Sequence, residues 1–83
     1  MEDRNQVRAI LLALAAERRG RTFCPSEAAR RLGEDWRPLM PLVRAEAGRL
    51  AREGRLVATQ GGVAVDVEAA RGPIRLGAAR SSG

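Results

Sequence analysis

Apolar residues recur at helical spacing in the first segment of the chain, from Asp3 to Arg19. The apolar positions in this segment follow the order of an amphipathic helix and are Val7, Ile10, Leu11, Leu14 and Ala15. Asp3 is suited to cap the first turn, and Gly20 stands where a helix would end. The pattern predicts a helix that buries one face.

A second, shorter helix is predicted after a brief turn or strand at residues 21–23. Cys24 precedes Pro25, which is favoured at the first position of a helix because its missing N–H needs no partner there. We expect this helix to run to about Leu32 and to stop at Gly33.

The third predicted helix begins at Pro41, continues to Glu53 and is closed by Gly54. Residues 34–40 before it are expected to be irregular, because prolines at positions 38 and 41 disfavour helical geometry in the residues that precede them. The spacing assigns the buried side of this helix to Leu42, Val43, Ala47 and Leu50.

Beyond Gly54 the apolar period changes to two, which is the period of a strand. Gly61 and Gly62 separate residues 56–60 from residues 63–67, as the two-residue turn of a β-hairpin does. This turn predicts that Gln60 pairs with Val63, Ala58 with Val65 and Leu56 with Val67. The more apolar face of the hairpin then carries Leu56, Ala58, Val63, Val65 and Val67.

The end of the chain contains one more ordered segment, residues 71–76, in which Ile74 and Leu76 flank a charged Arg75. This segment would add a third strand or cover the edge of the core. Residues 77–83 have too little apolar area to offset the entropy of ordering, and we expect a disordered tail there. The sequence thus predicts one domain over residues 1–76, of α+β class: a winged helix-turn-helix with three helices and a C-terminal β-hairpin, the wing.

Cysteine usage and hydropathy favour a cytoplasmic protein. The chain has a single Cys, which cannot form an internal disulfide and is typical of a reducing compartment. The apolar run from Ala9 to Ala16 is not expected to be a signal peptide, since acidic Glu2 and Asp3 stand where positive charge is required. No stretch approaches the roughly 18 apolar residues of a membrane span.

The residues give little support to catalysis. The chain has no His, so the commonest general base and zinc ligand are missing, and Cys24 alone cannot build a metal site. Its carboxylates are scattered and form no acid–base pair. We expect no enzyme activity, no cofactor and no metal.

Charge points to an anionic partner. Fifteen basic residues, all arginine, stand against ten acidic ones, for a net charge of +5. On the third predicted helix Arg44, Gly48 and Arg52 are each four apart and fall opposite the core, with Arg37 before them and Arg55 after them. A helix of this position enters the major groove in helix-turn-helix proteins, so these five residues predict contact with duplex nucleic acid, DNA or RNA.

Other interpretations remain open. An arginine-only complement also arises from codon bias, and any exposed helix face in such a chain shows an arginine stripe that Glu46 and Glu53 could neutralise. The alternative function is a protein-interaction or accessory module whose contact surface includes Trp36 and Met40. A protein partner or a homodimer is the corresponding expectation. Trp36 has a second interpretation, in which it packs over the second helix and fixes the turn.

Several motifs in fixed order resemble a known family. They are Thr22-x-Cys24-Pro25-Ser26-Glu27-x-Ala29, Trp36-Arg37-x-Leu39-Met40, Val43-Arg44, Leu50-Ala51-x-x-Gly54 and Arg71-Gly72-Pro73-Ile74-Arg75-Leu76. Together they are similar to the small bacterial family called domain of unknown function 3253, over about Val7 to Leu76. The resemblance implies a winged-helix-like domain of bacterial origin, and it implies no activity, substrate or partner.

Overall fold

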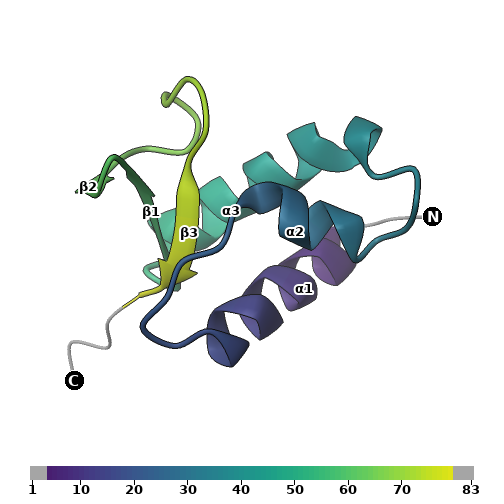
Figure 1. The fold of residues 1–83 in the computed structure, drawn as a ribbon, viewed down its shortest axis with the longest axis horizontal. Coiled ribbons are helices and arrows are strands. Elements are labelled where there is room, and N and C mark those ends of the chain that lie inside the picture. Colours follow the sequence, from purple (N-terminus) through teal and green to yellow (C-terminus); the bar gives the residue numbers. More distant parts are fainter. Residues whose placement is uncertain (1–3, 80–83) are drawn as a thin grey trace.

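A computed structural model describes residues 4–79 of the chain. Its elements, in chain order, are α1 Arg4–Glu17, α2 Pro25–Arg30, the 3-10 turn η1 Arg37–Leu39, α3 Met40–Arg52, β1 Leu56–Gln60, β2 Val63–Ala64 and β3 Arg75–Ala78. Three helices lie to one side of a three-stranded antiparallel sheet (Figure 1). The fold is α+β, as predicted, and is compatible with a winged helix. None of the helices in residues 4–79 is long and apolar enough to cross a membrane.

The three helices bury the faces that their periodicity predicts. Leu11 and Leu14 of α1 and Leu50 of α3 have no exposed surface. The core that they share also includes Val7, Ala15, Phe23, Ala28, Ala29, Val43, Ala47, Leu56, Ala58, Val67, Ile74 and Leu76. Ile10 and Leu42, which the spacing also placed on the buried side, are only partly buried and pack at the edge of this core.

The brief segment between α1 and α2 joins the sheet. Phe23 N–H donates to the Leu76 carbonyl oxygen at 2.8 Å, and Leu76 N–H donates to the Phe23 carbonyl oxygen at 2.7 Å. The Phe23 side chain is fully buried between helices and sheet. After this bridge, Cys24 N–H donates to Glu27 Oε2 at 3.3 Å, which satisfies a backbone donor at the start of α2.

The central strand of the sheet is β1, with β2 on one side and β3 on the other. The predicted turn is confirmed, because Gln60 pairs with Val63 and Val65 N–H still donates to the Ala58 carbonyl oxygen at 2.9 Å. The predicted pairing of Leu56 with Val67 is wrong. Leu56 pairs instead with Ala78 of β3, and β2 ends at Ala64.

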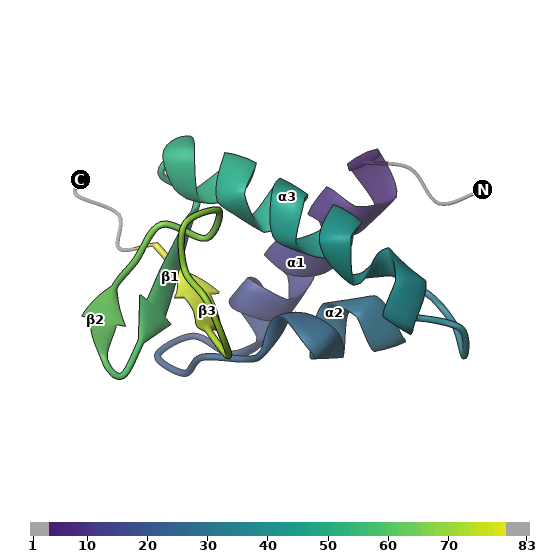
Figure 2. The same cartoon turned by 90° about the horizontal axis from the view of Figure 1, so that it is seen from above.

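The chain leaves the sheet after Val65 because a turn forms around Asp66. Its side chain accepts a hydrogen bond from Glu68 N–H at 3.0 Å, and its carbonyl oxygen accepts from the N–H of Ala70 at 2.8 Å. Val67 is 3% exposed and packs on α3 at Gly48 instead of pairing with β1. The view from above shows the connection between β2 and β3 arching against the middle of α3 (Figure 2). We call residues 65–70 the covering segment.

The last predicted segment, residues 71–76, contributes a third strand, β3, to the sheet. β3 also includes Gly77 and Ala78, which the sequence analysis placed in the tail. Gly77 pairs with Val57 and is buried against the chain that follows α1, where a Cβ would lie 3.5 Å from Thr22 Cγ2. Backbone pairing therefore orders this segment despite its lack of large apolar side chains. Residues 80–83, the rest of the expected tail, lie outside the described residues.

Candidate nucleic-acid interface

The face of α3 that carries Arg44 and Gly48 is covered by the chain itself. Gly48 is buried, and a Cβ at this position would lie 3.4 Å from Glu68 Cγ and 3.7 Å from Val67 Cβ. Arg44 Nη2 donates to the carbonyl oxygen of Ala70 at 3.2 Å. The expectation that these two residues line an open face is wrong, because the covering segment occupies that side of the helix.

The exposed side of α3 is turned about the helix axis from the predicted side, by about half of the roughly 100° that separates consecutive residues. Pro41, Ala45, Arg49 and Arg52 are exposed and lie along it at spacings of three to four residues. Arg52 belongs to the predicted set, whereas Arg49 was missed. The reason is that the pattern counted Leu42 as core, which shifted the expected outward direction towards Arg44.

Carboxylates accompany both exposed arginines of α3. Arg52 Nη1 lies 3.0 Å from Glu68 Oε1 of the covering segment, and both side chains are more than half exposed. Arg49 Nε lies 3.5 Å from Glu46 Oε2. These pairs reduce the positive field of the helix, as the sequence analysis had considered for Glu46.

A buried carboxylate joins α3 to α1. Glu46 is 2% exposed, and its Oε1 has no hydrogen-bond partner among the described residues, with Arg8 Nη1 at 3.7 Å as its nearest compensating charge. Arg8 also lies 2.7 Å from Glu53 Oε1, and this hydrogen bond holds the pKa of Glu53 below its ordinary value of 4.5. Arg8 therefore bridges Glu46 of α3 and Glu53, which follows the last residue of α3, and the pair of helices is held by charge as well as by packing.

Arg37 and Arg55, the two flanking members of the predicted site, are both exposed. Arg37 Cζ lies 4.7 Å from the centre of the Trp36 ring, and Arg30 of α2 lies 5.0 Å from the same ring. Trp36 is half-buried and packs against the core, which agrees with the interpretation that it fixes the turn before α3. Arg55 makes no ion pair within the described residues.

Met40, the other residue of the alternative protein-contact site, lines a shallow groove beside the covering segment. The groove measures about 470 Å³ and is mainly apolar, with Pro41 and Ala45 on one wall and Val67 and Ala70 on the other. Trp36 does not line it. The groove therefore includes one of the two residues of the alternative contact site, and Trp36 and Met40 are both partly buried.

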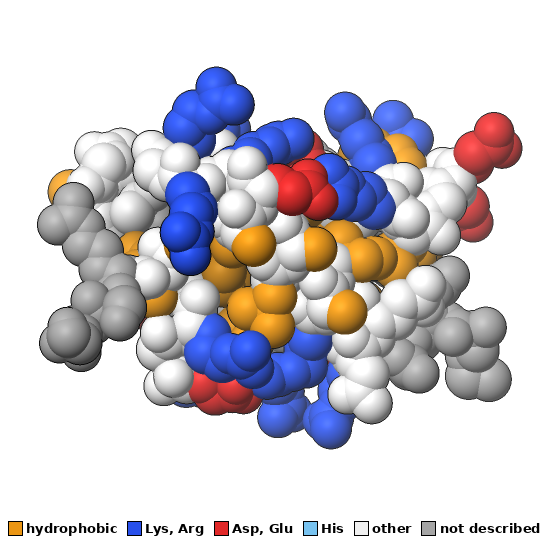
Figure 3. All heavy atoms as spheres, turned by 90° about the horizontal axis from the view of Figure 1, so that it is seen from below, with side chains coloured by type: hydrophobic (Ala, Val, Ile, Leu, Met, Phe, Trp, Pro, Cys, Tyr) orange, Lys and Arg blue, Asp and Glu red, His pale blue; other side chains and the backbone are white. Residues whose placement is uncertain are grey.

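Positive charge remains in excess once the ion pairs are formed. The ion-paired arginines are Arg8, Arg18, Arg31, Arg49 and Arg52. The other arginines of residues 4–79, which form no ion pair there, are Arg4, Arg19, Arg21, Arg30, Arg37, Arg44, Arg55, Arg71 and Arg75. Seen from below, arginine side chains stand on both sides of a band of apolar atoms (Figure 3). Helix α1 lies on this side of the molecule (Figure 1).

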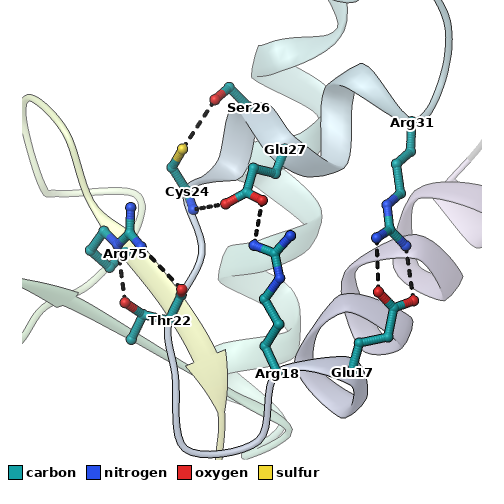
Figure 4. A network of polar contacts seen from close by, with 8 residues as sticks. All are labelled: Glu17, Arg18, Thr22, Cys24, Ser26, Glu27, Arg31 and Arg75. Carbon is teal, nitrogen blue, oxygen red and sulfur yellow. Dashed lines mark hydrogen bonds and ion pairs between the residues drawn. The ribbon is translucent and has the colours of Figure 1, made fainter.

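A second group of arginines gathers where α1 leads into α2. Arg75 of β3 donates from Nε to Thr22 Oγ1 and from Nη2 to the Thr22 carbonyl oxygen, each at 3.0 Å. Arg18 pairs with Glu27, whose other oxygen accepts from Cys24 N–H (Figure 4). Thr22, Glu27 and Arg75 belong to the motifs that carry the family resemblance, and the fold brings them to one place.

The electrostatics of this group are visible in Glu27. The hydrogen bond from Arg18 lowers the pKa of the Glu27 carboxyl below its ordinary value of 4.5, and the Cys24 amide and the charge of Arg75 act in the same direction. Beside it, Arg31 donates to both oxygens of Glu17 at 2.8 and 3.0 Å and lowers the pKa of that carboxyl too. The carboxylates here are therefore ionised at neutral pH.

The described residues contain no cluster of three or more His, Cys, Asp or Glu side chains that could hold a metal ion. Cys24 is half-buried, and its Sγ lies 3.2 Å from Ser26 Oγ. The thiol therefore lies beside a hydroxyl group in the first turn of α2.

Comparison with known proteins places the chain in a family. No curated protein matches its sequence. The model of one family matches residues 4–79, which is the whole part of the chain that the structure describes. On that match the chain belongs to the family described as "Protein of unknown function (DUF3253)".

Proposed function

We propose that this domain binds duplex nucleic acid, with DNA as the expected partner, through contacts between arginine side chains and backbone phosphates. The observation that carries the proposal is the surplus of guanidinium groups that meet no carboxylate within the described residues. Among the acidic residues there, only Glu34, Asp35 and Asp66 stay outside the ion pairs. A polyanion is the partner that such an imbalance attracts.

The surface that we assign to this contact follows the exposed side of α3. It consists of Arg37 before the helix, Arg52 on it and Arg55 after it, all exposed. The ion pair between Arg52 and Glu68 is open to solvent, and exposed pairs of this kind contribute only about 0 to 1 kcal/mol. A phosphate can therefore replace Glu68 at low cost.

The covering segment limits what kind of recognition is possible. Because it lies over Gly48 and engages Arg44, that side of α3 cannot enter a major groove without displacing it. Contacts to phosphate carry no sequence information, whereas contacts to base edges do. We therefore expect binding with weak sequence preference and strong salt dependence.

Fluorescence anisotropy with a labelled short DNA duplex tests this function at salt concentrations between about 50 and 200 mM. The logarithm of affinity is expected to fall linearly with the logarithm of salt, with a slope of about −0.9 for each phosphate contact. The triple variant Arg37→Gln/Arg52→Gln/Arg55→Gln should make this slope shallower by roughly 2 to 3 units. An RNA duplex of the same sequence compares the two nucleic acids.

A control variant with the same loss of charge is Arg4→Gln/Arg19→Gln/Arg71→Gln, whose three arginines are exposed and lie outside α3 and the residues that flank it. It should keep most of the slope. Absence of binding at low salt would overturn the proposed function. Equal losses in the two triple variants would overturn the assignment to the α3 surface.

A further inference from the structure

A polar pocket of about 470 Å³ lies beside the connection between α1 and α2, and none of the residues assigned to the nucleic-acid surface lines it. It is lined by Arg18, Arg21, Thr22 and Arg75. The close view shows how two of its arginines, Arg18 from the end of α1 and Arg75 from β3, are held in place by neighbouring groups (Figure 4). Three guanidinium groups around one small hollow form an environment that favours a multivalent anion.

Two of the three arginines are fixed before any ligand arrives. Glu27 holds Arg18 by one guanidinium nitrogen, and Thr22 holds Arg75 through Nε and Nη2. A guanidinium group has five N–H donors, so each of these arginines keeps further donors for a ligand. The Arg21 side chain makes no hydrogen bond or ion pair within the described residues, and Arg21 is exposed at the pocket. A prearranged site loses less entropy on binding than one that the ligand must assemble.

The charge balance of the pocket indicates the charge of its ligand. Arg18, Arg21 and Arg75 are opposed there by one carboxylate, that of Glu27, whose pKa is lowered so that it remains charged. The other acid nearby, Glu17, is satisfied by both ends of the Arg31 guanidinium. The local excess therefore corresponds to two positive charges, which a dianion neutralises and a monovalent carboxylate does not.

We propose that this pocket binds a phosphate dianion, either inorganic phosphate or the terminal phosphate of a phosphate monoester. The tetrahedral oxygens accept from Arg21 and from the free N–H groups of Arg18 and Arg75, and the volume leaves room for part of the molecule that carries the phosphate. This site does not depend on the proposed nucleic-acid surface, because the two share no residue.

The test is a titration of the isotope-labelled protein with inorganic phosphate, followed by NMR at constant ionic strength with chloride as the balancing anion. The amide of Thr22 and the Nε–H of Arg75 are expected to shift and to saturate. Arg21→Gln is expected to weaken binding about tenfold, the effect of one charge-assisted hydrogen bond. It should leave the fold intact, because the Arg21 side chain has no intramolecular partner among the described residues.

Arg19→Gln is the matched control, since Arg19 is exposed, lies two residues away and does not line the pocket. It should change the affinity for phosphate less than twofold. Arg75→Gln removes a second wall of the pocket and should again weaken binding, with its amide spectrum checking that β3 still pairs with β1.

Competition separates the two sources of phosphate. A dinucleotide with a 5′-phosphate that displaces inorganic phosphate would identify a monoester as a ligand of the pocket. Displacement by pyrophosphate but not by the dinucleotide would assign the pocket to the free anion. The proposal is overturned if the shifts do not saturate, if Arg19→Gln weakens binding as much as Arg21→Gln, or if a dinucleotide without the terminal phosphate competes equally well.

Discussion

Arg44 on α3 donates a hydrogen bond from Nη2 to the carbonyl oxygen of Ala70 at 3.2 Å, across 26 positions of sequence. The same nitrogen lies 3.5 Å from the carbonyl oxygen of Val67. Arg44, which the sequence pattern assigned to contact with nucleic acid, therefore links α3 to the covering segment. Two predictions test this relationship directly.

The first prediction concerns this link. Arg44→Gln is expected to lower the free energy of unfolding by about 1 kcal/mol, because two backbone carbonyl oxygens lose a charged donor. Hydrogen exchange at the amides of residues 68–70 should become faster than at those of β1. Arg55→Gln is the control and should stay within about 0.5 kcal/mol, since Arg55 is exposed and makes no ion pair in the described chain. Equal effects of the two substitutions would contradict this link.

Substitutions at Gly48 test whether the covering segment stays packed on α3. Gly48→Ala is expected to raise the stability by about 0.5 to 1 kcal/mol, because alanine favours a helix and its Cβ would make only ordinary contacts with Glu68 and Val67. Gly48→Leu should lower the stability, because its larger side chain has to displace the covering segment. Chemical denaturation measures both changes.

Ala45→Leu is the matched control for the leucine substitution, because Ala45 is exposed three positions earlier on the same helix. It should change stability by no more than about 0.5 kcal/mol. If Gly48→Leu proves equally harmless, the covering segment does not rest on α3 in solution.

The orientation of α3 can be tested at its core. Leu50→Ala is expected to cost about 2 to 5 kcal/mol, since the Leu50 side chain is fully buried and its removal leaves a cavity. Arg52→Ala, two residues further on, should cost less than about 1 kcal/mol because its pair with Glu68 is exposed. Comparable losses in urea denaturation would mean that α3 is turned differently about its axis.

Stability should depend on acid through Glu27. Its folded pKa is lowered chiefly by Arg18, so the unfolded chain takes up the proton more readily and the stabilisation is present above pH 4.5 and lost as the pH falls below it. Glu27→Gln is expected to lower stability at pH 7 and to make the decline between pH 5 and pH 3 less steep. Glu34→Gln serves as the control, because exposed Glu34 makes no ion pair in the described chain. If the free energy of unfolding of Glu27→Gln depends on pH as that of the unchanged protein does, Glu27 does not cause the acid dependence.

The sequence pattern was sufficient for the helices and for most of the core. Burial of Leu11, Leu14 and Leu50 follows from 3.6-residue periodicity alone, and the Gly61–Gly62 turn follows from a local conformational preference. The burial of Phe23 was not predicted, because a single aromatic residue in a three-residue segment has no periodicity. Its position depends on the bridge to Leu76.

The sequence by itself determined the α+β class, the order of elements and which side of each helix is apolar, because these depend on contacts between near neighbours in the chain. Tertiary structure alone decided which polar groups remain available. Val67 packs against Gly48 instead of pairing with Leu56, and Arg75 meets Thr22 across 53 positions. Both outcomes depend on how distant segments share the same space, and a one-dimensional pattern contains no distance between such segments.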